Sequence, residues 1–199
     1  MKTLVLKLGG SLAETGHLKS IIALTTRAQR PVIIVPGGGP FADSIRSLQP
    51  QLAISDETAH EMALLSMDQM GLYLASLHPR LITCQTLQQI AQVLQDGKIP
   101  VWLPYALQHA DPTLPSDWSV TSDALAARLA ERISGASVAL VKSCSIPPDA
   151  GLDLLTELGI VDRAFAPTVR RTHLTWGVYG AGDEPLLAKR LLIDPANIR

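Results

Sequence analysis

The sequence has few aromatic residues, little charge and only two cysteines, and each shortage excludes a class of protein. Tryptophan, tyrosine and phenylalanine make up 4% of its 199 residues, which argues against a surface that stacks nucleic-acid bases. The formal net charge is −1, so the composition indicates no basic face and no nucleic-acid partner. Charged residues amount to 18% and apolar residues to 47%, a balance that predicts a well-filled core rather than a disordered chain.

Cysteines, apolar runs and metal-type spacings are equally scarce. Cys84 and Cys144 have no partner at ligand spacing, so we expect both to be reduced, buried small hydrophobes in a cytoplasmic protein. No apolar run reaches the roughly 18 residues of a membrane span, which predicts no membrane partner. His60 begins an H-E-x-x-H motif, but Leu64 replaces the second histidine, so we expect no zinc site there.

Short apolar runs alternate with amphipathic stretches along the chain. The runs predict strands at residues 3–8, 32–35, 81–83, 101–103, 138–141 and 173–179. Apolar residues at a spacing of three to four predict helices between them, the longest over residues 56–77. This alternation indicates an α/β fold: a single domain over residues 1–199, built as a three-layer αβα sandwich with a mainly parallel central sheet.

A lysine and two glycines mark the end of the first predicted strand. Lys7 is followed closely by Gly9, Gly10 and Ser11. Glycine lets backbone N–H groups approach an anion, and the lysine adds a positive charge. A tight connection from strand to helix would use the same glycines, so this pattern alone leaves both interpretations open. The spacing fits neither the P-loop nor the dinucleotide-binding fingerprint.

Three successive glycines, Gly37, Gly38 and Gly39, follow the second predicted strand. Such a run is costly in chain entropy, and a helix predicted from about Phe41 would direct its positive N-terminal end to the same place. Two glycine-rich turns at two strand ends suggest two ligands that face each other. That arrangement suits phosphoryl transfer, which depends mainly on positioning and charge neutralisation.

An aspartate and a second lysine extend this pattern. Asp123 would lie in the first turn of a helix capped by Thr121 or Ser122, where it either offsets the helix dipole or orients lysines. Lys142 follows a strongly apolar predicted strand, as Lys7 does, although a solvated lysine at a strand end is the simpler alternative.

As a set, these motifs resemble those of the amino acid kinase family. The matching motifs are K-x-G-G-S at residues 7–11, P-G-G-G at 36–39, S-D at 122–123 and L-x-K at 140–142. The resemblance covers residues 1 to about 142. It is closest to a short branch of the family that acts in methanofuran biosynthesis, through segments 37–43, 55–60, 67–71, 118–123 and 159–165.

The resemblance implies a role for each matching residue. The catalytic group would be Lys7, Asp123 and Lys142; the nucleotide phosphates would lie against Gly9, Gly10, Ser11 and Lys142; the acceptor would be held by Gly37, Gly38, Gly39, Asp43 and His60. Taken alone, a histidine at position 60 is more often packed or hydrogen-bonded than bound to a ligand. ATP and Mg²⁺ are the implied cofactors, with the metal carried by ATP oxygens and no metal site on the protein.

The resemblance also implies an enzyme and its partners. We expect a homo-oligomeric kinase of a small phosphorylated metabolite, in the first place the aminomethyl-furan-methanol phosphate of methanofuran biosynthesis. A nucleoside monophosphate, a carboxylate or an isoprenoid phosphate is the alternative acceptor. After Lys142 the chain departs from the family's T-D-V-D-G-V-like turn and carries Pro147 and Pro148. This departure favours the rival interpretation, a non-catalytic anion- or nucleotide-binding protein on the same fold.

Overall fold

The computed structural model describes residues 1–108, 111 and 115–194. Its sheet is parallel throughout and has six strands in the order β3-β4-β2-β1-β5-β6. The strands are β1 (Leu4–Leu8), β2 (Val32–Pro36), β3 (Leu81–Cys84), β4 (Ile99–Trp102), β5 (Ser137–Val141) and β6 (Trp176–Tyr179). All the predicted strands are therefore confirmed, and their ends differ from the prediction by three residues or fewer.

Helices fill most of the connections between strands. They are α1 (His17–Thr25), α2 (Gly39–Leu52), α3 (Asp56–Ser76), α4 (Leu87–Gln95), α5 (Tyr105–Gln108), α6 (Ser122–Arg132), α7 (Leu152–Glu157), α8 (Phe165–Thr172) and α9 (Glu184–Arg190), with a 3-10 turn at Gly10–Ala13. The sequence predicted α1 to α4 and α6. It missed α5, α7, α8 and α9, each of eight residues or fewer, because so short a helix shows little periodicity.

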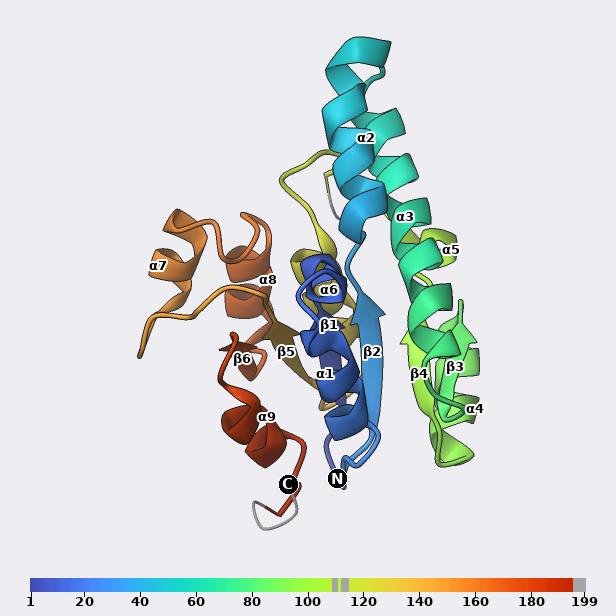
Figure 1. Ribbon diagram of the computed structural model, residues 1–199, viewed down its shortest axis with the longest axis vertical. Helices are drawn as coiled ribbons and strands as arrows, with labels where there is room; N and C mark the ends of the chain where they lie inside the picture. The colour runs from blue at the N-terminus through green and yellow to red at the C-terminus, as the bar shows by residue number, and fades with distance from the viewer. Residues whose placement is uncertain (109–110, 112–114, 195–199) are drawn as a thin grey trace.

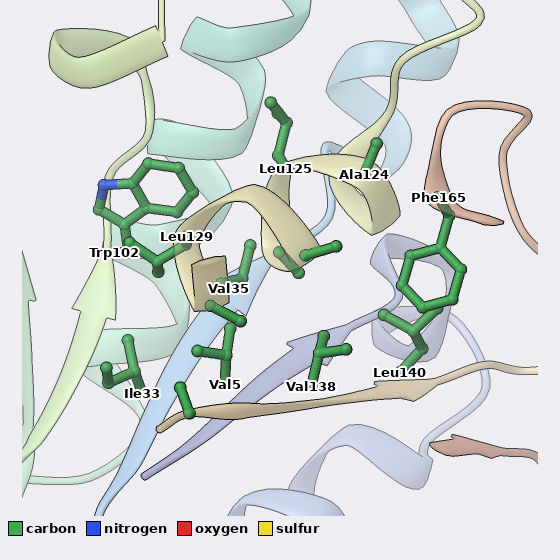
Figure 2. Packing of buried hydrophobic residues seen from close by; sticks show 14 of the residues in the cluster. Val5, Ile33, Val35, Trp102, Ala124, Leu125, Leu129, Val138, Leu140 and Phe165 are labelled. Carbon is green, nitrogen blue, oxygen red and sulfur yellow. The ribbon is translucent and has the colours of Figure 1, made fainter. Parts of the chain in front are cut away.

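Alternating residues of the central strands point into two separate cores. Val5 and Ile33 pack against α6 and α8 on one face, where Leu125 and Phe165 are also fully enclosed (Figure 2). On the opposite face, Leu6 and its neighbours on the sheet pack against α1 and α9. Helices thus cover both faces of a parallel sheet, which confirms the predicted three-layer sandwich.

Helices α2 and α3 pack side by side and project beyond the carboxyl ends of the strands (Figure 1). The side chain of Ser55 caps α3 by accepting a hydrogen bond from the Thr58 N–H at 3.2 Å. Because α2 begins at Gly39, shortly after the end of β2, the base of this hairpin lies beside the glycine-rich turns that follow β1 and β2.

The structure bears on three further expectations, which concern the cysteines, the loops and membrane-spanning segments. Cys84 and Cys144 are both free, but only Cys84 is buried; Cys144 is exposed because it lies in the turn after β5. Prolines in the sequence predict loops at residues 109–118 and 147–151. The second is irregular as expected, whereas the first falls partly outside the described residues. In the part of the chain that the structure describes, no helix is long and apolar enough to cross a membrane.

Candidate active site

Two lysines and an aspartate meet at the carboxyl edge of the sheet. Lys7 lies near the end of β1, and Lys142 directly follows β5, the neighbouring strand. Asp123 lies in the first turn of α6. Lys7 Nζ is 2.8 Å from Asp123 Oδ1, and Lys142 Nζ donates a hydrogen bond to Asp123 Oδ2 at 2.6 Å. The structure therefore brings together the three residues expected to form the catalytic group, with the carboxylate between the two cations.

These charged groups are withdrawn from water, which changes their titration. Lys7 is 5% exposed and Asp123 is 2% exposed. Burial alone raises the pKa of Asp123, but the charges of Lys7 and Lys142 outweigh it and hold that pKa below its usual value. Burial, together with the charge of Lys7, lowers the pKa of Lys142 to about 8, although Asp123 opposes this change. Asp123 and Lys142 are both charged at neutral pH.

Asp162, which the sequence analysis assigned no role, joins the same cluster from the segment between α7 and α8. Its Oδ2 accepts hydrogen bonds from Thr121 N at 2.9 Å, Thr121 Oγ1 at 2.8 Å and Ala124 N at 2.9 Å. Neither Thr121 nor Ser122 caps α6 as expected, because the Thr121 hydroxyl donates to Asp162 instead. The contact joins residues 41 positions apart, so no local motif could have revealed it.

The two glycine-rich turns touch each other through their backbones. A Cβ atom built on Gly10 would lie 2.2 Å from the backbone N of Gly39, and one on Gly37 would lie 2.6 Å from the N of Gly10. Gly39 also has a φ of +56°, a backbone conformation that residues other than glycine rarely adopt. These glycines are required for the turns to pack together, whether or not a ligand is bound.

Hydrogen bonds within the sheet limit which N–H groups can face a phosphate. The Gly9 N–H donates to the Val141 carbonyl at 2.9 Å, and the Gly37 N–H donates to a carbonyl of β1 at 2.8 Å. Gly10 and Ser11 begin the 3-10 turn, whose first N–H groups have no partner inside the turn. The N–H of Gly9 is therefore already used within the protein, and contact of Gly9 with nucleotide phosphates stays a prediction.

A cavity of about 170 Å³ lies at the base of the α2–α3 hairpin. Four of the five residues expected to hold the acceptor line it: Gly38, Gly39, Asp43 and His60. Gly37 is buried beside it and does not line it. Burial lowers the pKa of His60, although a hydrogen bond to the Asp117 backbone opposes this, so the ring is neutral at pH 7. Much of the remaining wall is apolar and comes from Ala63, Leu64, Met67, Val120 and Leu125.

Trp118 forms another wall of this cavity and is held from two sides. Its Nε1 donates a hydrogen bond to Gln49 Oε1 at 2.5 Å, and the Arg46 guanidinium lies 4.4 Å from the ring centroid. Arg46 also pairs with Asp43 at 3.4 Å. The sequence analysis gave neither Trp118 nor Arg46 a role; a single tryptophan in a polar loop of an aromatic-poor chain was the available signal.

Two further hollows adjoin the lysines. One of about 480 Å³ is lined by Lys7, Lys142 and the residues expected to meet nucleotide phosphates, Gly9, Gly10 and Ser11. Ser143 also lines it, and its hydroxyl lies 2.8 Å from that of Ser11. The other, of about 620 Å³, shares Lys142 with the first hollow and Trp118 and Thr121 with the cavity of about 170 Å³. Lys142 thus lines both hollows, and the second hollow adjoins that cavity.

Comparison with known proteins agrees with this geometry. Residues 2–145 match the model of the amino acid kinase family. A stretch of 123 residues is 28% identical to [5-(aminomethyl)furan-3-yl]methyl phosphate kinase of Methanocaldococcus jannaschii. That stretch covers 61% of this chain and 56% of the relative, so the match spans little more than half of the relative's length.

Solved structures share the fold over nearly the whole chain. The uridylate kinase of Archaeoglobus fulgidus is 20% identical with a TM-score of 0.65, and covers 96% of each chain. The UMP kinase of Ureaplasma parvum is 12% identical with a TM-score of 0.69, over 98% of this chain and 96% of that one. An isopentenyl phosphate kinase is 16% identical with a TM-score of 0.59, over 96% of each chain. Together, the family match, the shared fold and the order of the motifs along the strands show that this chain belongs to the amino acid kinase family.

Proposed function

We propose that the protein is an ATP-dependent kinase that transfers a phosphoryl group to a small phosphorylated metabolite. The buried group of Lys7, Asp123 and Lys142 carries this proposal, because both lysines line the hollow beside the first glycine-rich turn, and Asp123 and Lys142 line the hollow that adjoins the cavity of about 170 Å³. In phosphoryl transfer, negative charge spreads over the oxygens of the moving group, and fixed cations stabilise it. Because one carboxylate holds both ammonium groups in place, they supply this positive charge without a large movement of the side chains.

The proposed reaction needs little covalent chemistry from the protein. A phosphate oxygen of the acceptor forms a bond to the γ-phosphorus of ATP, the bond from that phosphorus to the β–γ bridging oxygen breaks, and ADP leaves. The product is a diphosphate. The attacking phosphate is already ionised at neutral pH, so no general base is required. Positioning and charge neutralisation are therefore the main contributions of the site.

Mg²⁺ fits this scheme as an ion that ATP brings to the site on its phosphate oxygens. Among the described residues, no group of three or more His, Cys, Asp or Glu is placed to hold a metal ion. The nearest carboxylates, Asp123 and Asp162, already accept hydrogen bonds from protein groups. The ion would therefore be held mainly by phosphate oxygens and water, which is usual for Mg²⁺ in nucleotide sites.

For the acceptor, we propose the aminomethyl-furan-methanol phosphate of methanofuran biosynthesis. The name of the Methanocaldococcus jannaschii relative supports this substrate class. The cavity of about 170 Å³ with its apolar wall also suits a single small ring better than a nucleoside. A nucleoside monophosphate, which carries both a sugar and a base, would need a larger space at the same place.

Phosphoryl transfer can be followed directly with the purified full-length chain. A panel of small phosphates is incubated with MgATP, and ³¹P NMR detects the new diphosphate while a coupled assay detects ADP. We expect transfer to the furan-methanol phosphate and slower or no transfer to UMP. Nucleotide binding without transfer to any acceptor would contradict the kinase assignment and favour a non-catalytic binding protein.

Narrowing the cavity tests which ligand it receives. Ala63 lines the cavity and is half-buried, so Ala63→Leu should raise the acceptor KM and leave the KM for ATP unchanged. Ala91→Leu makes the same change at an exposed position of α4 and is the matched control. A raised KM for ATP in Ala63→Leu, with the acceptor KM preserved, would mean that the two sites are reversed.

We also propose that the protein associates with itself through the α2–α3 hairpin. Several large apolar side chains are exposed on these two helices: Phe41, Leu48, Leu52, Leu65, Leu72 and Tyr73. Groups of exposed apolar side chains commonly mark protein interfaces. Sedimentation velocity should give a dimer or larger species for the wild type and a smaller one for Leu72→Asp. A monomeric wild type at micromolar concentration would exclude this interface.

A further inference from the structure

We propose that Asp162 is a positioning residue that holds Asp123, and through it Lys7 and Lys142, in their working arrangement. This inference rests on the proposed kinase function. The Asp162 N–H donates to Asp123 Oδ2 at 3.3 Å, the same oxygen that accepts the bond from Lys142. One backbone group therefore helps to fix the orientation of the carboxylate on which both lysines depend.

The side chain of Asp162 fixes the surroundings of that carboxylate. Its Oδ2 accepts three hydrogen bonds from the start of α6, and its Oδ1 accepts one from Phe165 N at 2.8 Å, where α8 begins. In the described part of the chain, these four hydrogen bonds all come from N–H or O–H donors, a pattern that suits the ionised carboxylate and opposes burial and the charge of Asp123, which raise the pKa of Asp162. A negative charge at two helix N-termini is also favourable. Asp162 thus joins α6, which carries Asp123, to the segment that lines the hollow beside Lys142.

Asp162 also completes the charge balance of the cluster. Three charged groups face Lys142: Lys7 from β1, Asp123 from α6 and Asp162 from the segment between α7 and α8. Glu157 and Arg163 line the hollow of about 620 Å³ that Lys142 also lines. The charge of Asp162 opposes the effect of burial and raises the pKa of Lys142. Without this charge, two buried cations would share one carboxylate, and Lys142 would lose its proton at lower pH.

The first experiment compares Asp162→Asn with the wild type over a range of pH. Asparagine keeps the size of the side chain but loses its charge. Because misplaced catalytic groups slow the reaction, we expect kcat to fall by about 10- to 100-fold with little change in the acceptor KM. The alkaline decline of kcat/KM, which reports the free enzyme, should also move to lower pH, since Lys142 must be protonated to hold phosphate oxygens.

A matched control separates this role from a general loss of charge. Asp153 is exposed on α7 and pairs only with Arg170 among the ion pairs of the described residues. Asp153→Asn should leave both kcat and its pH profile unchanged. A lower melting temperature for Asp162→Asn with an unchanged alkaline limb and near-normal kcat would show that Asp162 is only a helix cap, and would overturn the proposal.

A second measurement needs no turnover, so it separates failure of this proposal from failure of the kinase assignment. In ¹³C-lysine NMR spectra, the Lys142 signal should titrate at lower pH in Asp162→Asn than in the wild type. If Asp162→Asn does not fold, the reciprocal variant Lys142→Met serves instead. Loss of the Lys142 cation should raise the pH at which the Asp162 carboxyl carbon titrates, because coupling between two sites is mutual. An unchanged titration would overturn the proposal in either case.

Discussion

Lys7, the residue before the last of β1, holds its ammonium group 2.8 Å from Asp123 Oδ1, and both side chains are almost fully enclosed. A buried ion pair of this kind contributes little net stability compared with well-packed apolar residues. Lys7 also faces the hollow lined by the first glycine-rich turn, where an anion can be bound. The pair is therefore better explained by the chemistry of a phosphoryl group than by folding.

Replacing Lys7 should abolish most turnover while the fold persists. Lys7→Met keeps an apolar stem of similar length, and Asp123 retains Lys142 as its partner. We expect kcat to fall about 100-fold or more, the scale of losing one preorganised charge donor. Steady-state assays with circular dichroism on the same samples check this. Lys19→Met, at an exposed position of α1, should behave as wild type; turnover close to wild type in Lys7→Met would exclude the assigned role.

Replacing Asp123 should cost stability as well as activity. Asp123→Asn breaks both buried ion pairs and leaves Asp162 as the remaining counter-charge beside the two ammonium groups, and breaking a buried pair in this way costs about 3–5 kcal/mol. Urea denaturation measures the loss. Adding Lys142→Met to Asp123→Asn removes one of the uncompensated cations and should restore part of the stability. A loss of only about 0.3–1 kcal/mol would mean that Asp123 does no more than offset the dipole of α6.

The sheet could be predicted from sequence because its strands carry strong local signals. Residues such as Val5, Leu6, Ile33 and Ile34 belong to continuous apolar runs, and turn signals separate the runs. Helices such as α7 and α8 could not be predicted, because six or eight residues contain too few turns to show periodicity. Their positions depend instead on long-range contacts, such as that of Asp162 with α6.

In the candidate site, too, residues with a strong local signal could be predicted and residues placed by long-range contacts could not. Lys7 and Lys142 could be predicted because each stands at the end of an apolar run, and parallel strands bring such ends to one edge. Trp118 and Asp162 stand in irregular segments with no periodic pattern. Their roles depend on partners such as Gln49 and Thr121, which only the folded chain brings close.

The pH dependence of activity should report Lys142. Its pKa is lowered to about 8, first by burial and then by the charge of Lys7. The protonated form is the one that holds phosphate oxygens, so kcat/KM, which reports the free enzyme, should decline as pH rises through about 8. Lys142→Arg stays charged throughout this range, because a guanidinium does not lose its proton. Any activity that this variant retains should lack the alkaline decline; a decline identical to that of the wild type would assign it to another group.

Stability should show the opposite trend in the same pH range. The unfolded chain keeps Lys142 protonated up to its ordinary pKa of about 10.4, whereas the folded protein releases that proton near pH 8. Between these values the unfolded state binds more protons, so the contribution of Lys142 to the free energy of unfolding rises with pH. Urea denaturation at pH 7.5 and 9.5, compared between wild type and Lys142→Arg, isolates this contribution.

Removing the Trp118 ring should weaken acceptor binding selectively. The indole forms one wall of the acceptor cavity and is held by Arg46 and Gln49. An aromatic wall against a small ring contributes about 0.5–1.5 kcal/mol beyond the apolar area that it covers, so Trp118→Ala should raise the acceptor KM about tenfold. Trp118→Phe keeps a ring beneath Arg46 but loses the hydrogen bond to Gln49, and should have an intermediate KM. Steady-state kinetics with each substrate varied in turn tests this ordering; a change confined to the KM for ATP would place Trp118 in the nucleotide site instead.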